Sequence, residues 1–216
     1  MNFNIIATGS SGNAVIIDDY ILIDCGVPFK ALSRYVKDLK IVFLTHIHSD
    51  HFNKTTIRRL AQERPTLRFA CCNWLLSELL SCGVPIRNID PLSVGGIYNY
   101  GVFRISPVKL YHDVQNCGYR IFIGDEKAIY ITDTATVQGI SAKGYDLYLI
   151  EANYSEEEIQ QRIAAKEAAE QYVYEYRVLK THLSKEKCDQ WLIENMEENS
   201  QYIYIHQHRK EYENVQ

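Results

Sequence analysis

The most constraining feature of this sequence is a polar cluster that directly follows an apolar run of strand length. Residues 41–45 read IVFLT, and such a continuous run is typical of a β-strand buried on both faces. The next residues read HIHSDHF, so three histidines and one aspartate occur within six positions. A fold that holds both segments must bring a buried strand to an edge where polar side chains gather.

The spacing H-x-H-x-D-H predicts a metal site. Where a chain leaves an extended strand, residues i and i+2 point the same way, so His46 and His48 can share one metal ion. If the backbone then turns, Asp50 and His51 project back toward the same cavity and can hold a second ion. Imidazole nitrogen and carboxylate oxygen suit Zn²⁺, and also Mn²⁺ or Fe²⁺. The alternative, a polar cluster that only caps a helix, is disfavoured because the spacing is so specific.

A site for two ions needs more ligands, and further candidates follow predicted strands. In open α/β sheets, this is where the chemistry gathers. Strand-like runs end at His112, Asp133 and His206, and His182 precedes a predicted helix that Ser184 caps. One such residue alone would often only cap a turn. Their combination with the motif makes them candidate ligands.

Length and composition indicate one globular domain over residues 1–216. Hydrophobic residues are 46% and charged residues 23% of the 216 positions, which allows a sizeable core. The predicted strands fall into two groups with helices interspersed, and no repeat or linker separates them. The net charge of −4 argues against a protein that grips long duplex DNA unaided, but it allows a small anionic substrate.

The sequence also indicates where in the cell the protein is expected. The start, MNFNIIATGSSGN, lacks the basic and apolar regions of a signal peptide, and no apolar run approaches the roughly 20 residues of a membrane span. The six cysteines are scattered without a C-x-x-C pair, so we expect reduced, buried thiols. These features predict a cytoplasmic protein without membrane association. A homodimer stays open.

The order of the motifs resembles the metallo-β-lactamase superfamily. LIDCG, LTHIHSDH, ITDT and a late THLS or IH occur in the family's order across nearly the whole chain. The resemblance implies an α/β fold, a four-layer αββα sandwich with two metal ions at one edge of the β-sandwich. TGSSGNAVII, SDHF, HDVQNCGYRI, TDT and LIEANY look most like its YycJ/WalJ-type branch of exonuclease-like phosphodiesterases, and more distantly like tRNase Z.

The resemblance implies ligands for two divalent ions, Zn²⁺ or Mn²⁺. The first ion would be bound by three histidines, which are His46, His48 and His112. The second would be bound by the end of the motif and a late histidine, so by Asp50, His51 and either His206 or His182.

The same resemblance assigns roles around those ligands. Asp133 would bridge both ions, and Asp50 would also orient the nucleophile. The late ligand is ambiguous: His206 fits best because the family's last ligand follows its final strand. His182 would then protonate the leaving group.

Five further residues are weaker candidates for orienting the motif loop or contacting substrate. Asp24 in LIDCG resembles the superfamily's buried aspartate, although it could equally be a turn residue. Ser10 and Ser11 could offer hydroxyls to a phosphate, or only form a tight turn. Asn116 lies in a segment similar to the phosphodiesterase branch. His208 stands where many relatives carry serine, and could be a ligand, a substrate contact or exposed.

Together these features predict a dinuclear metal-dependent hydrolase. The preferred reaction is hydrolysis of phosphodiester bonds in single-stranded nucleic acid or nucleotides by a metal-bridging hydroxide. Basic residues near the motif could track phosphates or simply face solvent; they are Arg58, Arg59, Arg64 and Arg68. The same ligands could instead serve a thioester, lactone or other carboxyl-ester hydrolase. A cyclic-nucleotide specialist and a non-catalytic metal-binding module are further alternatives.

Overall fold

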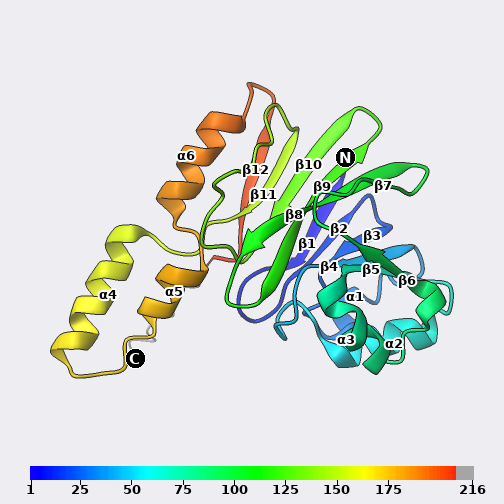
Figure 1. The fold of residues 1–216 in the computed structure, drawn as a ribbon, viewed down its shortest axis with the longest axis horizontal. Coiled ribbons are helices and arrows are strands. Elements are labelled where there is room, and N and C mark those ends of the chain that lie inside the picture. The colour runs from blue at the N-terminus through cyan, green and yellow to red at the C-terminus, as the bar shows by residue number, and fades with distance from the viewer. Residues whose placement is uncertain (208–216) are drawn as a thin grey trace.

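Two six-stranded sheets face each other in the computed structural model, which describes residues 1–207 (Figure 1). The strands of the first sheet follow chain order and are β1 Phe3–Ala7, β2 Ala14–Ile17, β3 Ile21–Ile23, β4 Ile41–Leu44, β5 Arg68–Cys72 and β6 Ile89–Leu92. The strands of the second sheet are β7 Tyr98–Asn99, β8 Phe103–Tyr111, β9 Gln115–Ile123, β10 Glu126–Ile131, β11 Leu147–Glu151 and β12 Gln201–Ile205. They too lie side by side in chain order.

Strand direction brings the ends of both sheets to one edge of the sandwich. Strands β3 to β6 pair in parallel in the first sheet, and β10, β11 and β12 pair in parallel in the second. Parallel strands have their carboxyl ends on the same side of a sheet. The residues after β4, β10 and β12 are therefore delivered together, and these include His46, Asp133 and His206.

Strand β4 shows why the two sheets stack. Val42 and Leu44 pack in the cluster on the outer face of the first sheet, whereas Ile41 and Phe43 pack in the cluster between the sheets. Side chains of a strand alternate between faces, so a continuous apolar run needs a hydrophobic layer on each side. The expectation of a strand buried on both faces is confirmed.

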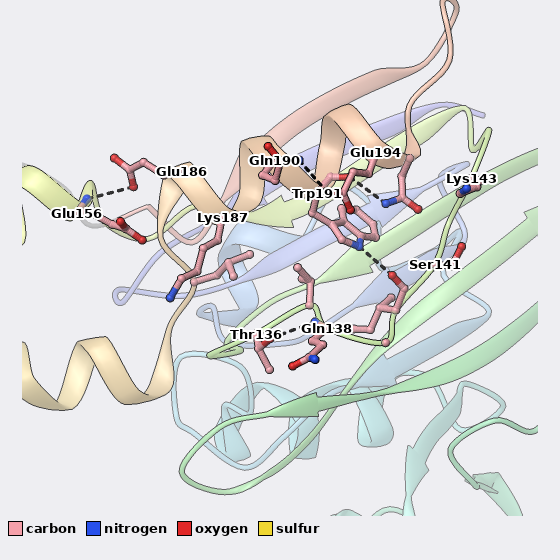
Figure 2. Close-up of a pocket in the computed structure, with 15 residues that line it drawn as sticks. Thr136, Gln138, Ser141, Lys143, Glu156, Glu186, Lys187, Gln190, Trp191 and Glu194 are labelled. Carbon is pink, nitrogen blue, oxygen red and sulfur yellow. Dashed lines mark hydrogen bonds between the residues drawn. The ribbon is translucent and has the colours of Figure 1, made fainter.

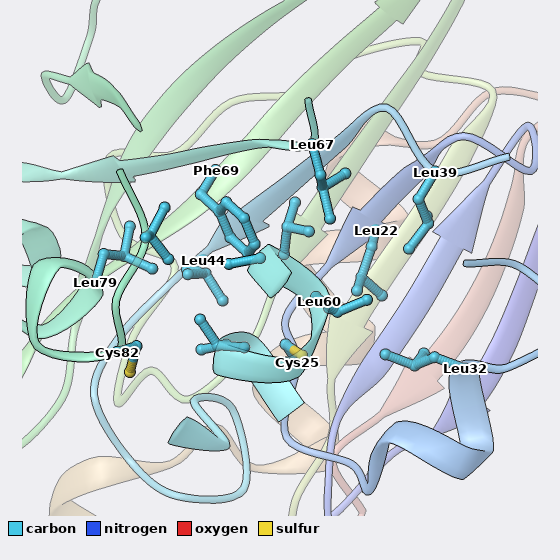
Figure 3. Close-up of a cluster of buried hydrophobic side chains, with 14 of the residues drawn as sticks. Leu22, Cys25, Leu32, Leu39, Leu44, Leu60, Leu67, Phe69, Leu79 and Cys82 are labelled. Atoms are coloured by element: carbon cyan, nitrogen blue, oxygen red, sulfur yellow. The ribbon is translucent and has the colours of Figure 1, made fainter. Parts of the chain in front are cut away.

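Helices cover the two outer faces. On the first sheet these are α1 Phe29–Leu32, α2 Lys54–Glu63 and α3 Leu76–Ser81, and Figure 3 shows Leu60 and Leu79 from this layer packed with Leu22, Leu44 and Phe69. On the second sheet, α6 Lys185–Asn195 contributes Trp191 and Leu192 to a third cluster. The predicted αββα sandwich is confirmed.

The remaining helices lie beside the sheets rather than on them. Helices α4 Glu156–Ala168 and α5 Glu175–Thr181 pack mainly on each other through a small apolar cluster (Figure 1). Two short 3₁₀ turns, η1 Asn73–Leu75 and η2 Ile86–Asn88, complete the described elements. Within residues 1–207, no helix is both long and apolar enough to cross a membrane.

Candidate metal centre

A buried aspartate holds the motif loop in place. Asp24 accepts hydrogen bonds from Thr45 N at 3.0 Å and from Thr45 Oγ1 at 2.9 Å, and its Oδ2 lies 2.7 Å from His51 Nδ1. Tyr130 donates its hydroxyl to the same Oδ2 at 3.2 Å. Asp24 therefore fixes both ends of the motif, His51 directly and His46 through Thr45 Oγ1 at 2.9 Å from its Nδ1.

The first donor cluster joins the loop after β4 to the ends of β8 and β10 in the second sheet. It consists of one ligand atom each from His46, His48, His112 and Asp133, all within 4.8 Å of one another. His46 Nε2 lies 3.2 Å from Asp133 Oδ2, and His112 Nε2 lies 3.2 Å from His48 Nδ1. His112 is oriented by the backbone, since its Nδ1 lies 2.8 Å from Thr181 O.

The second cluster shares Asp133 with the first. Its members are Asp50, His51, Asp133 and His206. His51 Nε2 lies 3.1 Å from Asp133 Oδ2, and Asp50 Oδ2 lies 3.4 Å from His206 Nε2 and 3.5 Å from His51 Nε2. The Asp133 carboxylate thus borders both clusters, as a bridging ligand would.

A third group places the two late histidines differently. His182 Nδ1 lies 2.6 Å from Glu151 Oε1 and 4.0 Å from Asp133 Oδ1. His206 also lies 3.3 Å from Glu151 Oε1, but in addition it lies beside Asp50 and 3.1 Å from Asp133 Oδ1. The geometry thus puts His206 with the end of the motif and ties His182 to the fully buried Glu151.

The donor set suits a divalent cation. His46 Nε2 is buried and lies 3.2 Å from Asp133 Oδ2, but within residues 1–207 it makes no hydrogen bond of good geometry, which is costly unless another group satisfies it. Burial lowers the pKa of His46 to about 4, so its imidazole is neutral at pH 7. Burial opposes the charge on Asp133, but His51 and His206 outweigh it and hold the pKa of that carboxyl well below its usual range. A neutral imidazole beside an ionised carboxylate, as in His46 and Asp133, is the kind of ligand pair that Zn²⁺ and Mn²⁺ require.

Three site residues have strained backbones. The φ angles of Asp24, Asp133 and His206 are 58°, 51° and 50°, in the left-handed region that costs non-glycine residues about 1–3 kcal/mol each. Such strain clusters at functional sites, where the surroundings enforce it. Each of these residues follows a strand; Asp133 and His206 contribute to the donor clusters, whereas Asp24 contacts His51.

The residues that were weaker candidates for contacting substrate or the motif loop differ in where they lie. Ser10 and Ser11 are exposed and make no described contact with the clusters. Asn116 is buried and donates to Asp133 O at 2.7 Å, so it supports the backbone of that residue. His208 lies outside the described residues. The 9–13 turn instead contributes Asn13, whose Nδ2 lies 2.8 Å from His51 Nε2.

The arginines near the motif mostly serve their own chain. Arg59 pairs with Glu63, and Arg68 pairs with Asp90. Arg64 donates to the backbone carbonyls of Val36 and Leu39. These contacts fit a structural helix and strand surface better than a phosphate-tracking face.

Two residues that were not predicted as site members contact candidate site histidines. Glu151 accepts from Thr134 N at 2.8 Å and from Leu183 N at 3.3 Å in addition to holding His182. Asp113 places Oδ1 3.1 Å from His112 Nε2. The sequence signal was their position: Glu151 ends an apolar strand, and Asp113 directly follows a candidate ligand.

A separate hollow of about 790 Å³ lies between α6 and residues 136–143 (Figure 2). Trp191 closes part of it and donates its Nε1 hydrogen to Ile140 O at 2.8 Å. None of its lining residues belongs to the donor clusters, although Leu183 adjoins His182. The hollow is therefore distinct from the metal centre.

Two facing sheets flanked by helices, with histidine–aspartate clusters at one edge, define an αββα metalloprotein scaffold. The chain belongs to the metallo-β-lactamase superfamily, because residues 19–206 match the family model described as beta-lactamase superfamily domain. The resemblance seen in the motifs is confirmed at this level.

Two exodeoxyribonucleases are similar to this chain at low sequence identity. The chain is 24% identical over 172 residues to exodeoxyribonuclease YycJ of Bacillus anthracis, covering 73% of this chain but only 64% of that protein. It is 25% identical over 224 residues to exodeoxyribonuclease WalJ of Streptococcus pneumoniae serotype 2, covering 94% of this chain and 80% of that protein. Less than two thirds of the first relative's length is therefore matched.

Solved structures support the fold. The short form of human tRNase Z matches with a TM-score of 0.69 and 14% identity, over 96% of this chain and 93% of that one. Zn²⁺-bound PqqB from Methylobacterium extorquens matches with a TM-score of 0.71 and 12% identity, over 96% and 89%. At such identity these likenesses establish architecture alone.

Gly26 permits the close packing of the motif loop. A Cβ on Gly26 would lie 1.7 Å from Asp50 O and 2.7 Å from His51 N, so the backbone would have to move. We expect Gly26→Ala to lower the free energy of unfolding by roughly 3 kcal/mol or more and to weaken the second cluster's metal binding. Urea denaturation and metal analysis measure both effects. Gly101→Ala is the comparison, since its Cβ would meet open space and the variant suffers only the strain of a positive φ of 85°; equal losses for both variants would contradict the packing argument.

The metal-free protein should lose stability as the pH rises. Burial opposes protonation of His206, but Asp133 and Asp50 outweigh it and raise the pKa to about 10 from an ordinary 6.5. A raised pKa gives stability that is complete below pH 6.5 and disappears as the pH approaches 10. Denaturation curves between pH 6 and 10 should show this decline for the chelated protein, and a flatter dependence for His206→Gln. Identical slopes would exclude His206 as the source.

Proposed function

We propose that this protein is a dinuclear metal-dependent phosphodiesterase, with single-stranded nucleic acid or nucleotides as substrates. The observation that carries the proposal is the Asp133 carboxylate, which borders a His46–His48–His112 cluster on one side and an Asp50–His51–His206 cluster on the other. Two divalent ions held there, Zn²⁺ or Mn²⁺, would supply a hydroxide nucleophile at neutral pH and offset charge on the phosphoryl oxygens.

Asp50 orients the attacking water in this proposal. Its carboxylate lies between His51 and His206, and its side chain is 20% exposed, whereas that of Asp133 is 2% exposed. Although burial opposes ionisation, His206 and His51 lower the pKa of Asp50, so the group is an anion that accepts hydrogen bonds near neutral pH. Of the two carboxylates in the second cluster, it is thus the one that solvent can reach.

His182 protonates the leaving oxygen in this proposal. Its Nδ1 faces Glu151 at 2.6 Å, which leaves Nε2 for a substrate, and its side chain is 13% exposed. Burial disfavours the imidazolium, but the Glu151 carboxylate outweighs this and raises the pKa of His182. A histidine whose pKa is raised and whose ring is fixed by a buried carboxylate is suited to general acid catalysis.

The comparisons support a nucleic-acid substrate over other esters. The two relatives named above are called exodeoxyribonucleases. We therefore propose a nuclease or nucleotide phosphodiesterase, with the cytoplasm as its location.

Metal removal provides the test. After treatment with EDTA and gel filtration, hydrolysis of bis-p-nitrophenyl phosphate and of single-stranded DNA or RNA should fall below about 1% of its starting rate, because the ions supply the nucleophile. Adding Mn²⁺ or Zn²⁺ should restore it. His48→Ala separates true turnover from contamination. Turnover of thioesters or lactones alone would overturn the proposed function.

A further inference from the structure

Arg177 lies at the rim of the first histidine cluster and is held there by Asp113. Arg177 Nη2 donates to Asp113 Oδ2. The other oxygen, Asp113 Oδ1, lies 3.1 Å from His112 Nε2 and 3.3 Å from His48 Nε2. The guanidinium is therefore separated from two candidate ligands by the width of a single carboxylate.

Helix α5 links this arginine to the rest of the centre. Thr181, in the last turn of the helix, presents its carbonyl oxygen to His112 Nδ1 at 2.8 Å and donates its hydroxyl to Arg177 O at 2.8 Å. His182 follows directly at the end of the helix. The short helix that orients His112 and His182 thus also fixes the position of Arg177.

Arg177 has hydrogen-bond capacity left for a ligand. A guanidinium has several N–H donors, and the bond to Asp113 is the side-chain hydrogen bond that the structure describes for Arg177 within residues 1–207. Its side chain is 55% exposed. Asp113 alone would repel a phosphodiester at this rim. Arg177 offsets that charge and offers the planar donor geometry that phosphate oxygens match.

Two exposed tyrosines lie within electrostatic range of Arg177. Tyr172 is 83% exposed and Tyr174 is 43% exposed, and both interact electrostatically with Arg177. The backbone keeps Tyr174 close, because Arg177 N donates to Tyr174 O at 2.9 Å. Aromatic rings beside a cation are the combination on which single-stranded nucleic acids stack, and the rings have no comparable use in binding a lone phosphate.

We propose that Arg177 binds the phosphate adjacent to the scissile one, while Tyr172 and Tyr174 offer a stacking surface to the neighbouring base. The preferred substrate is then a single-stranded oligonucleotide rather than a mononucleotide or cyclic nucleotide. This inference rests on the proposed phosphodiesterase function. It follows because Arg177 lies beside the candidate ligands rather than among them, so its phosphate is the next along the strand.

Arg177→Ala tests the assignment on substrates of different length. On a single-stranded pentadeoxynucleotide, we expect kcat/KM to fall about tenfold, mainly through KM, because one charge-assisted phosphate contact is lost. The slope of log KM against log salt concentration should shrink by about 0.7, the value for one phosphate of a single strand. On bis-p-nitrophenyl phosphate, which has no adjacent phosphate, kcat/KM should stay within about twofold of the unsubstituted protein.

Arg59→Ala is the matched control. The Arg59 side chain is 56% exposed and pairs with one carboxylate, Glu63. The substitution therefore removes the same positive charge at a position that is not on the rim of the first cluster. The control should leave the pentanucleotide kinetics unchanged. Tyr172→Ala should raise KM for the pentanucleotide without altering the salt slope, since stacking involves no counterion release.

The possible results separate this inference from the proposed function. If the unsubstituted protein cleaves the pentanucleotide but Arg177→Ala does so equally well, the inference is overturned and the phosphodiesterase stands. If Arg177→Ala loses bis-p-nitrophenyl phosphate and pentanucleotide turnover alike, Arg177 acts on the metal centre and the inference is again overturned. If the unsubstituted protein cleaves no phosphodiester with Mn²⁺ or Zn²⁺, both fail.

Discussion

Asp133→Asn is expected to lower kcat/KM for bis-p-nitrophenyl phosphate by roughly 10³-fold or more, because it alters the one carboxylate that both donor clusters share. The Asp133 oxygens lie 3.1–3.2 Å from nitrogen atoms of His46, His51 and His206. The amide keeps the size of the side chain but loses its negative charge. Metal content, measured by plasma mass spectrometry, should fall for both ions.

Two comparisons isolate the shared role of Asp133. His48→Ala removes a member of the first cluster only, so one ion should remain bound. Asp189→Asn changes a half-buried aspartate on α6 that pairs with Lys185 and accepts a hydrogen bond from Tyr204, outside both clusters, and should behave like the unsubstituted protein. If Asp133→Asn retained two ions and near-normal turnover, the carboxylate could not be the bridge between the clusters.

His182→Ala should discriminate between leaving groups. A general acid contributes roughly 10²–10⁴-fold when the departing oxygen is a sugar hydroxyl, which must be protonated. A p-nitrophenolate leaves without a proton, so bis-p-nitrophenyl phosphate should lose less than about tenfold. We therefore expect a large loss of kcat on a dinucleotide and a small loss on the nitrophenyl ester, with metal content unchanged.

Glu151→Gln provides the companion variant for that prediction. The Glu151 carboxylate raises the pKa of His182 against the opposing effect of burial, so the amide should move the alkaline limb of the dinucleotide pH profile to lower pH. An equal loss of both substrates in His182→Ala, together with loss of an ion, would instead make His182 a metal ligand.

The elements that direct the site could be predicted from sequence because their patterns are local. The run before the motif is apolar at each of Ile41, Val42, Phe43 and Leu44, and the structure buries all four in a strand. The turn that follows is equally local, since His48 O accepts hydrogen bonds from His51 N at 2.9 Å and Phe52 N at 2.8 Å. Motif spacing and the positions of strand ends were thus sufficient to predict that most candidate ligands lie close together.

The parts that escaped prediction depend on contacts distant in sequence. Residues 172–178 alternate like a strand, yet α5 forms there because Val178 packs with Ile159 and Ile163 of α4, and Glu175 binds Lys166 at 2.8 Å. Residues 28–39 carry apolar side chains at helical spacing, yet the α-helix there is regular only at Phe29–Leu32. Strand β6 contains Pro91, a residue that disfavours a strand in sequence but is tolerated because β6 is at the edge of its sheet.

Tertiary contacts also decide between residues that look alike in sequence. His182 and His206 both follow secondary-structure elements and both could be the last ligand. Only the fold shows that Asp50 lies 3.4 Å from His206 Nε2, whereas His182 Nδ1 is occupied by Glu151. Likewise, nothing in the spacing of Asp113 and Arg177 indicates that they meet at the rim of the first cluster.

Anomalous diffraction from crystals grown with Zn²⁺, recorded on both sides of the zinc absorption edge, tests the central claim most directly. The account predicts two peaks flanking the Asp133 carboxylate, one among His46, His48 and His112 and the other among Asp50, His51 and His206. No peak in these clusters, or a peak only between Glu151 and His182, would contradict it.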